Sequence, residues 1–220
     1  MNQYLEATYF LDCEHESVRR FAEENSSKGA SAVEKAVQLY YAVRDGFIYY
    51  PYLFDLRRES LKASNLLKKT DCNCIEKAII LAASARAVAI PSRLSFYIVK
   101  NHIAAEKIER ILQTNELVFH GVTEFYLNDK WVKATPAFNY QLCKFFNVEP
   151  LEFDGSHDAI FQQYDSAGNQ FMEYLHDYGS YADMPYDKCI AELKRHYPHL
   201  FSAGRIEDDN LVLDLRELTA

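Results

Sequence analysis

The stretch TDCNCIEKAIILAASARAVAIPSRLSF constrains the fold of this chain more than any other segment. Asp71 and Asn73 are residue types that cap helices, and the apolar run that follows them predicts a helix over residues 74–88. Pro91 disfavours helical structure soon afterwards. Residues 93–99 alternate in polarity and are rich in β-forming types, so they predict a strand. A helix therefore leads directly into a sheet, and a thiol lies where that helix begins.

The elements expected around this segment predict an α+β fold. Helices are expected mainly before it and antiparallel strands after it, which is the order typical of that class. Asn-Asp at residues 128–129 predicts the turn of a hairpin with arms at residues 120–127 and 130–134. Ser31 and Glu34 predict a capping box. The other expected elements are a strand at residues 4–11 and helices at residues 17–24, 32–43, 60–68, 103–112 and 187–196.

The composition argues against several classes of protein. Of the 220 residues, 49% are hydrophobic and 14% are aromatic, which is enough for a substantial core and argues against disorder. The formal net charge of -8 gives no support to binding of nucleic acid or of an anionic membrane surface. We expect a cytosolic location, because no apolar run could span a bilayer and the N-terminus lacks the pattern of a signal peptide. The five cysteines would then be free thiols.

Cys74 and His120 are the candidate catalytic pair. Cys74 lies at the predicted start of the helix, where the partial positive charge would stabilise a thiolate and lower the thiol pKa. His120 opens the predicted hairpin and could lie beside that helix start, and a thiolate partnered by histidine is a strong nucleophile. Position and chemistry alone favour the alternative that Cys74 is an ordinary half-buried core thiol. A zinc site that adds Cys72 and His102, or a disulfide between Cys72 and Cys74, fits less well because the C-x-x-C spacing is absent.

The residues around this pair resemble the core motif of the transglutaminase-like superfamily. In that family a nucleophilic cysteine opens a helix that ends in R-x-x-G-I-P-A-R, and the spacings from Cys74 to Arg86, Pro91 and Arg93 fit that pattern. The stretch HGVTEFYLNDKWVKATP, which begins at His120, resembles the second family block, in which a histidine opens a strand and a tryptophan lies on the returning strand. The resemblance covers roughly Ala32 to Asn139.

Three positions depart from the family pattern. Ala89 replaces the glycine of the helix-ending motif, so we expect the end of the helix to take another geometry. Cys72 stands where the family usually has glycine. Counted from Trp131, the place of the family's catalytic aspartate falls on Thr135, whose hydroxyl can accept a hydrogen bond from imidazole but carries no charge. Asn139 is an alternative that would give a Cys-His-Asn arrangement, and a third alternative is that no residue orients the imidazole.

The resemblance implies a papain-like α+β fold in a single domain over residues 1–220. Its core covers about residues 32–139, with N-terminal helices and the cysteine-bearing helix packed on an antiparallel sheet, and residues 140–220 form an extension of unassigned role. It also implies a cysteine-dependent amidase, protease or acyltransferase that acts on amide bonds of a protein or peptide through a thioester. The expected site residues are Cys74, His120, Thr135 and Asn139. A catalytically inactive binding or scaffold module is the alternative.

Other residues are given supporting roles. No cofactor or metal is expected, because the sequence lacks the D-x-D-x-D-G loop of calcium sites. Arg86 and Arg93 are expected to fix the joint between helix and strand by hydrogen bonds rather than to contact substrate. The aromatic residues that precede the cysteine are expected to be core residues; they are Tyr49, Tyr50, Tyr52 and Phe54.

Overall fold

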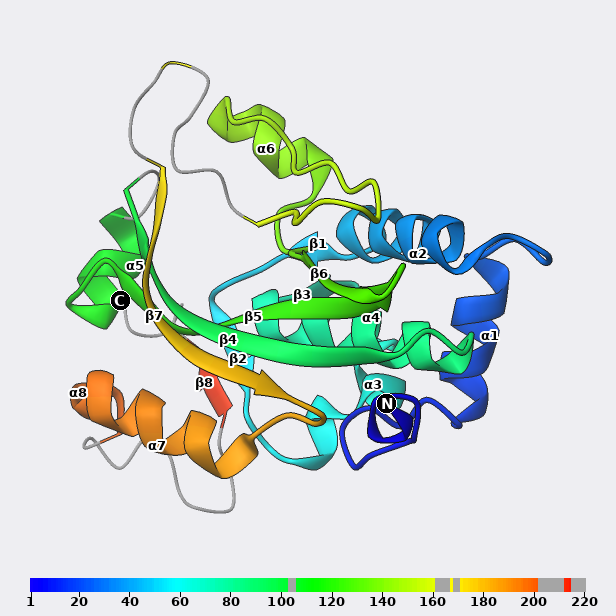
Figure 1. The fold of residues 1–220 in the computed structure, drawn as a ribbon. Coiled ribbons are helices and arrows are strands. Elements are labelled where there is room, and N and C mark those ends of the chain that lie inside the picture. The colour runs from blue at the N-terminus through cyan, green and yellow to red at the C-terminus, as the bar shows by residue number, and fades with distance from the viewer. Residues whose placement is uncertain (103–105, 161–166, 168–170, 202–211, 215–220) are drawn as a thin grey trace.

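An antiparallel sheet of four strands, in the order β6-β5-β4-β7, lies at the centre of the fold. The computed structural model describes residues 1–102, 106–160, 167, 171–201 and 212–214. Figure 1 shows the long strands β4 and β5 crossing the middle of the molecule, with β7 curving along β4. The α+β class expected from the sequence is confirmed. The strands are β4 (Ser92–Asn101), β5 (Glu116–Leu127), β6 (Lys130–Ala134) and β7 (Met172–Tyr181).

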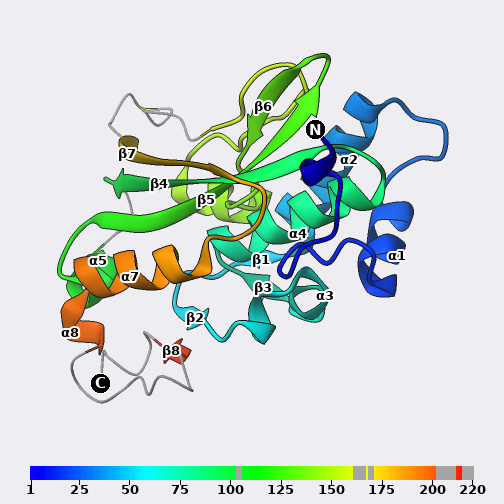
Figure 2. The ribbon, with the colours of Figure 1, turned by 60° about the horizontal axis from the view of Figure 1, so that its bottom comes forward.

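Helix α4 (Cys74–Ala87) is the element around which the rest of the chain packs. Every residue from Ile75 to Arg86 is buried, because α4 packs on β5 and is also contacted by three N-terminal helices. Figure 2 shows α4 between the sheet and these helices. The capping box predicted at the start of the second of them is confirmed. The three are α1 (Glu16–Glu24), α2 (Ala32–Gly46) and α3 (Ala63–Leu66).

The prediction that α4 would end in a geometry different from that of the family motif is wrong. Ala89 has a φ of 62°, so it takes the left-handed conformation that glycine would have taken. The N–H of Ala89 donates to the carbonyl of Arg86 at 2.9 Å, and the N–H of Ile90 donates to that of Ala85 at 2.9 Å. These two bonds make the usual glycine-type helix ending. They satisfy main-chain carbonyls at the helix end, which offsets the strain of a Cβ in this conformation.

The C-terminal part of the chain packs against β5 and against the segment that precedes α4. Helix α7 (Tyr186–His196) lies beside β5, α8 (Pro198–Phe201) packs on α7, and β8 (Val212–Asp214) pairs antiparallel with β2 (Leu53–Asp55). The chain after the hairpin therefore returns to the segment just before α4. The remaining elements are α5 (Glu106–Leu112), α6 (Tyr140–Phe146), the parallel pair β1 (Ile48–Tyr49) and β3 (Asp71–Cys72), and the short 3-10 helices η1 (Asn2–Tyr4) and η2 (Glu59–Leu61).

Several elements differ from the sequence predictions. The strand expected at residues 4–11 is not formed, and this segment contains the end of η1 followed by bends. The helix expected at residues 60–68 divides into η2 and α3. Of the helix expected at residues 103–112, the part from Glu106 is confirmed, and residues 103–105 lie outside the described residues. The first arm of the hairpin begins at Glu116, so His120 lies inside a strand rather than at its start.

Two clusters of buried side chains hold the sheet. The larger cluster lies between α4 and the sheet and also includes residues of α1, α2 and α7. The smaller one contains Val122 of β5, Tyr97 of β4 and Cys143 of α6. Within the ranges that the structure describes, no helix is long and apolar enough to cross a membrane. That residues 1–220 form a single domain stays a prediction.

Candidate active site

Cys74 is the first residue of α4, and the residues around it fix that helix start firmly. The Asn73 side chain accepts from the N–H of Glu76 at 3.1 Å, and the Glu76 carboxylate accepts from the N–H of Asn73 at 2.9 Å. This capping box satisfies main-chain donors at the start of the helix. Residues 71–72 are held as a strand against residues 48–49. The sequence therefore places Cys74 at a defined point between a short strand and a buried helix.

His120 lies in β5 next to a backbone irregularity. It pairs with Tyr97 of β4, and directly beside it the register shifts, so that two residues of β5 lie opposite one residue of β4. Phe119 has a φ of 64° there, which is an uncommon conformation for a bulky residue. Strained backbone of this kind concentrates at functional sites. The bulge re-aims the side chains of β5 at the position of His120.

Gly121 is what allows α4 to begin so close to β5. A Cβ at this position would lie 3.0 Å from the Cα of Ile75 and 3.3 Å from the carbonyl oxygen of Cys74. Both of these are main-chain atoms, so a side chain could not be accommodated without moving the helix start. The absence of a side chain at Gly121 thus brings the nucleophile candidate against the strand that carries His120.

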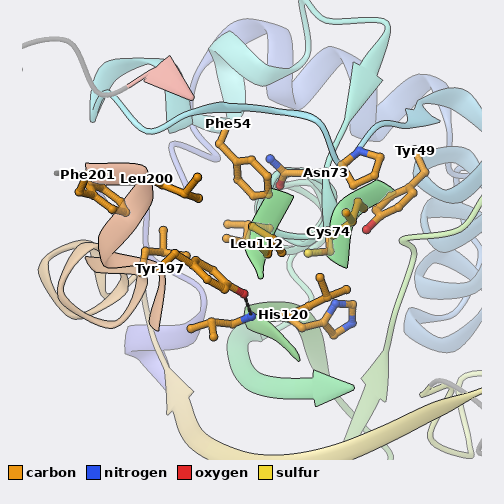
Figure 3. A pocket seen from close by; sticks show the side chains of 15 residues that line it. Tyr49, Phe54, Asn73, Cys74, Leu112, His120, Tyr197, Leu200 and Phe201 are labelled. Carbon is orange, nitrogen blue, oxygen red and sulfur yellow. Dashed lines mark hydrogen bonds between the residues drawn. The ribbon is translucent and has the colours of Figure 1, made fainter. Parts of the chain in front are cut away.

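Cys74 and His120 line the same pocket. Figure 3 shows Cys74, His120 and Tyr49 on one side of it and Tyr197 on the opposite side. The expectation that Cys74 and His120 come together is in line with this arrangement. Cys74 also packs against both hydrophobic clusters, which places it where the two meet.

Both groups of the pair are uncharged at neutral pH. Burial raises the pKa of Cys74 to about 11, although the N–H groups of Gly121, Ile75 and Cys74 itself favour the thiolate. Burial also lowers the pKa of His120 to about 3. The expectation that the helix start would lower the thiol pKa is therefore wrong for this state, because loss of hydration outweighs the helix terminus. The resting site holds a thiol and a neutral imidazole.

The two candidates for the third catalytic role have different surroundings. The Asn139 side-chain oxygen accepts from the N–H of Tyr49 at 3.0 Å, and its nitrogen donates to Gln141 at 3.1 Å. Thr135 is 1% exposed, and its hydroxyl has no hydrogen-bond partner among the described residues. Extending the β5–β6 register by one residue places Thr135 opposite Val122 and thus on the same face of the sheet as His120. Neither residue is among those that line the pocket.

Residues missed from the sequence form most of the pocket. Half-buried Tyr49 and Phe54 line it, although the aromatic cluster was expected to be core. Tyr50 and Tyr52 line an adjoining pocket. Leu193, Tyr197, Leu200 and Phe201 of α7, α8 and the turn between them form its far side. The apolar positions of the predicted helix at residues 187–196 were a signal for a packed face, but not for which surface they would cover.

Arg86 and Arg93, the two arginines of the motif, serve the framework rather than the pocket. Arg86 donates to the carbonyl of Ser92 at 2.8 Å, so its expected role at the joint between helix and strand is confirmed. Arg93 instead binds Glu124 across the β4–β5 pair, with nitrogen and oxygen 2.7 Å apart, and stacks over the Trp131 ring. No group of three or more metal-ligating side chains occurs among the residues described.

The arrangement defines a class of fold before any relative is considered. A cysteine opens a buried helix, the helix packs on an antiparallel sheet, and a histidine on that sheet lines the same pocket. This is the papain-like fold of cysteine enzymes. Residues 19–136 match the profile of the transglutaminase-like superfamily, and the chain belongs to that superfamily. The match begins within α1, most of which it includes, whereas the sequence resemblance begins after that helix.

The comparison with solved structures gives a more distant likeness. The chain is similar to a protein from Cytophaga hutchinsonii named "Putative Cysteine Protease", with 12% sequence identity and a TM-score of 0.47. The aligned region covers 81% of this chain and 53% of that one, so this chain spans about half the length of that structure. No curated protein matches the chain.

Proposed function

We propose that this protein is a cysteine-dependent enzyme that cleaves or transfers the acyl group of amide or peptide bonds, with Cys74 as nucleophile and His120 as base. The observation that carries the proposal is the shared pocket: a thiol at the first residue of a buried helix and an imidazole on the adjacent strand face the same space. Membership of the transglutaminase-like superfamily supports the same chemistry. The proposed substrate is a protein or peptide, and the proposed location is the cytosol, where thiols stay reduced.

The mechanism starts from neutral groups. As the Cys74 sulfur attacks the carbonyl carbon, its proton passes to His120, and the N–H groups that face the sulfur stabilise the developing oxyanion. The carbon–nitrogen bond then breaks, His120 returns the proton to the leaving amine, and a thioester remains on Cys74. Water or a second amine attacks the thioester and restores the thiol, with hydrolysis or transamidation as the outcome.

Thr135 is the better candidate of the two for orienting His120. It belongs to the same sheet face as His120, and its buried hydroxyl, which makes no hydrogen bond to a described residue in this structure, is available to accept one from the ring. The amide of Asn139 is engaged by Tyr49 and Gln141, so it fixes the segment before α4 instead. A hydroxyl accepts a hydrogen bond from imidazole but adds no charge, so it orients the ring with less stabilisation than a carboxylate would give.

An inactive binding module with this fold is the second candidate. The observation that favours it is the pKa of Cys74, because a neutral thiol with a pKa of about 11 is a weak nucleophile at neutral pH. Loss of the family's aspartate at Thr135 acts in the same direction. The two candidates differ in one measurable respect, namely whether an acyl group is ever transferred to Cys74.

Detection of the thioester tests the proposal. The protein is incubated with a set of acyl p-nitroanilides and short peptide amides, quenched in acid, and digested for site-resolved mass spectrometry. We expect an acyl adduct on Cys74 that hydroxylamine removes, and a rate about 10²–10⁴ lower in His120→Ala. Cys143→Ala is the matched control, because it removes a different buried thiol. Adducts distributed over several cysteines, or none with any substrate, would favour the inactive module.

A further inference from the structure

The pocket beside Cys74 has a chemical character that points to the kind of acyl group it receives. Among the described residues that line it, none carries a charged side chain, and the polar contribution comes mainly from Asn73, Cys74, His120 and two tyrosines. Placing a charged group there would cost hydration that no lining side chain replaces.

The side of the pocket opposite Cys74 is held in place by a buried tyrosine. The Tyr197 hydroxyl accepts from the N–H of Val118 at 2.8 Å and donates to the carbonyl of Glu116 at 2.8 Å. These bonds fasten the end of α7 to the start of β5, the strand that carries His120 (Figure 3). Leu193 and Leu200, on either side of Tyr197, are 5% and 4% exposed and present aliphatic surface to the pocket.

The remaining lining continues this apolar surface. Ile108 and Leu112 of α5 contribute from one direction, and Phe54 of β2 contributes from another. Phe201 lies at the end of α8 and is only half-buried, so it is the aromatic residue of this wall that can be changed with least effect on the core. Apolar surface that already surrounds the reactive pair is available to bury an apolar substrate group.

We propose that this pocket binds the acyl part of the substrate and selects an uncharged aliphatic or aromatic group. The inference rests on the proposed function, since it assigns the group that becomes attached to the Cys74 sulfur. An apolar acyl group gains affinity from each methylene it buries, whereas an acyl group with a carboxylate or ammonium is disfavoured. The C-terminal helices α7 and α8 thereby supply part of the specificity of a site whose reactive residues lie on α4 and β5.

Chloromethyl ketones with different groups on the carbonyl test this assignment. The sulfur of Cys74 displaces chloride from the methylene carbon, the thiol proton leaves to His120 or solvent, and the group on the carbonyl occupies the position of an acyl chain. Rates of Cys74 alkylation are compared for methyl, hexyl and carboxyethyl chloromethyl ketones by site-resolved mass spectrometry. We expect the hexyl reagent to react about tenfold faster or more than the methyl reagent at low concentration, and the carboxyethyl reagent to be slowest.

Two Phe→Asp variants form a matched pair for this experiment. Phe201→Asp introduces a carboxylate at the pocket and is expected to bring the ratio of hexyl to methyl rates close to one. Phe145→Asp makes the same change on α6, where the side chain is 81% exposed, and is expected to keep the wild-type ratio. Leu112→Ala is a second pocket variant, used if Phe201→Asp fails to fold, and is expected to lower the ratio as well.

Failure of this inference is distinguishable from failure of the proposed function. A wild-type ratio near one, with Cys74 alkylated, overturns the pocket assignment and leaves the nucleophile intact. If Cys74 is not alkylated, the proposed function fails, and calorimetry with the unreactive hexyl methyl ketone decides the pocket assignment. Binding that exceeds that of acetone and is weakened by Phe201→Asp then supports an apolar pocket, and no binding overturns it.

Discussion

Burial of Lys77 is expected to make the free energy of unfolding depend on pH. It lies one turn after Cys74 in α4, is 0% exposed, and donates to the carbonyl oxygens of Arg44 at 2.8 Å and Ala137 at 2.9 Å. Burial lowers its pKa from 10.5 to about 7, although nearby Cys72 and Asp45 favour the charged form. Lys77→Met removes the titrating group and keeps a chain of similar length.

The sign of the effect follows from proton binding. Between pH 7 and pH 10.5 the unfolded chain holds the Lys77 proton and the folded protein does not, so the free energy of unfolding rises with pH. The slope is about 1.4 kcal/mol per pH unit at most. Over the 3.5 units between 10.5 and 7, this corresponds to about 5 kcal/mol, as an order of magnitude. The destabilisation is fully present below pH 7 and absent above pH 10.5.

Urea unfolding of wild type and Lys77→Met, from about pH 6 to about pH 9.5, measures this difference. Because the other titrating groups are common to both proteins, the difference in unfolding free energy isolates Lys77. We expect the free energy of unfolding of wild type to rise, relative to that of Lys77→Met, by about 2–3 kcal/mol between about pH 7.5 and about pH 9.5. Lys144→Met, at an exposed position on α6, is the control with no such gain. A difference that stays flat over this range would refute the reasoning.

Three further predictions concern α4 and its ends. Ala89→Gly should stabilise the protein by about 1 kcal/mol or less, because glycine takes a φ of 62° without strain; a thermal midpoint unchanged or lowered would contradict this. Gly121→Ala should destabilise by about 1–3 kcal/mol in urea unfolding, because its Cβ meets the main chain of Ile75 at 3.0 Å; a neutral result would show that the helix start shifts freely. Iodoacetamide alkylation of Cys74 should rise about tenfold per pH unit from pH 6 to pH 9, and a plateau there would mean that the thiolate is already paired with His120⁺.

Local signals in the sequence predicted the framework of the site well. The helix with Cys74 at its first residue, the cap at Asn73 and the hairpin turn at residues 128–129 all depend on interactions between residues close in the chain. Such interactions are encoded by residue type and spacing, so they can be derived without knowledge of the tertiary fold. The prediction that Cys74 and His120 share a site followed from two sequence blocks that resemble the transglutaminase-like superfamily and occur in the same order as in that family.

Features that depend on contacts distant in sequence could not be predicted in the same way. Strand β7 was missed because it lies at the sheet edge, has only two buried residues, and has two register shifts against β4 that break the alternation of polarity. The left-handed conformation of Ala89 was missed because alanine rarely takes it. The two hydrogen bonds that stabilise it here cannot be recognised from the residue type alone. The role of α7 and α8 as a pocket wall depends on their docking to β5, which no local pattern specifies.

The pKa values of Cys74 and His120 show that residues close in sequence do not by themselves determine the charge state of the site. The start of α4 does favour a thiolate, and the N–H groups near Cys74 act in that direction, but enclosure in an apolar pocket has the larger effect. The same enclosure changes what a proton transfer requires. Moving the proton from Cys74 to His120 creates both charges together, and their attraction in a pocket of low dielectric compensates for part of the lost hydration. A bound acyl group that excludes water would strengthen that attraction further, so the apolar pocket that keeps the resting pair neutral also favours charge separation once a substrate is in place.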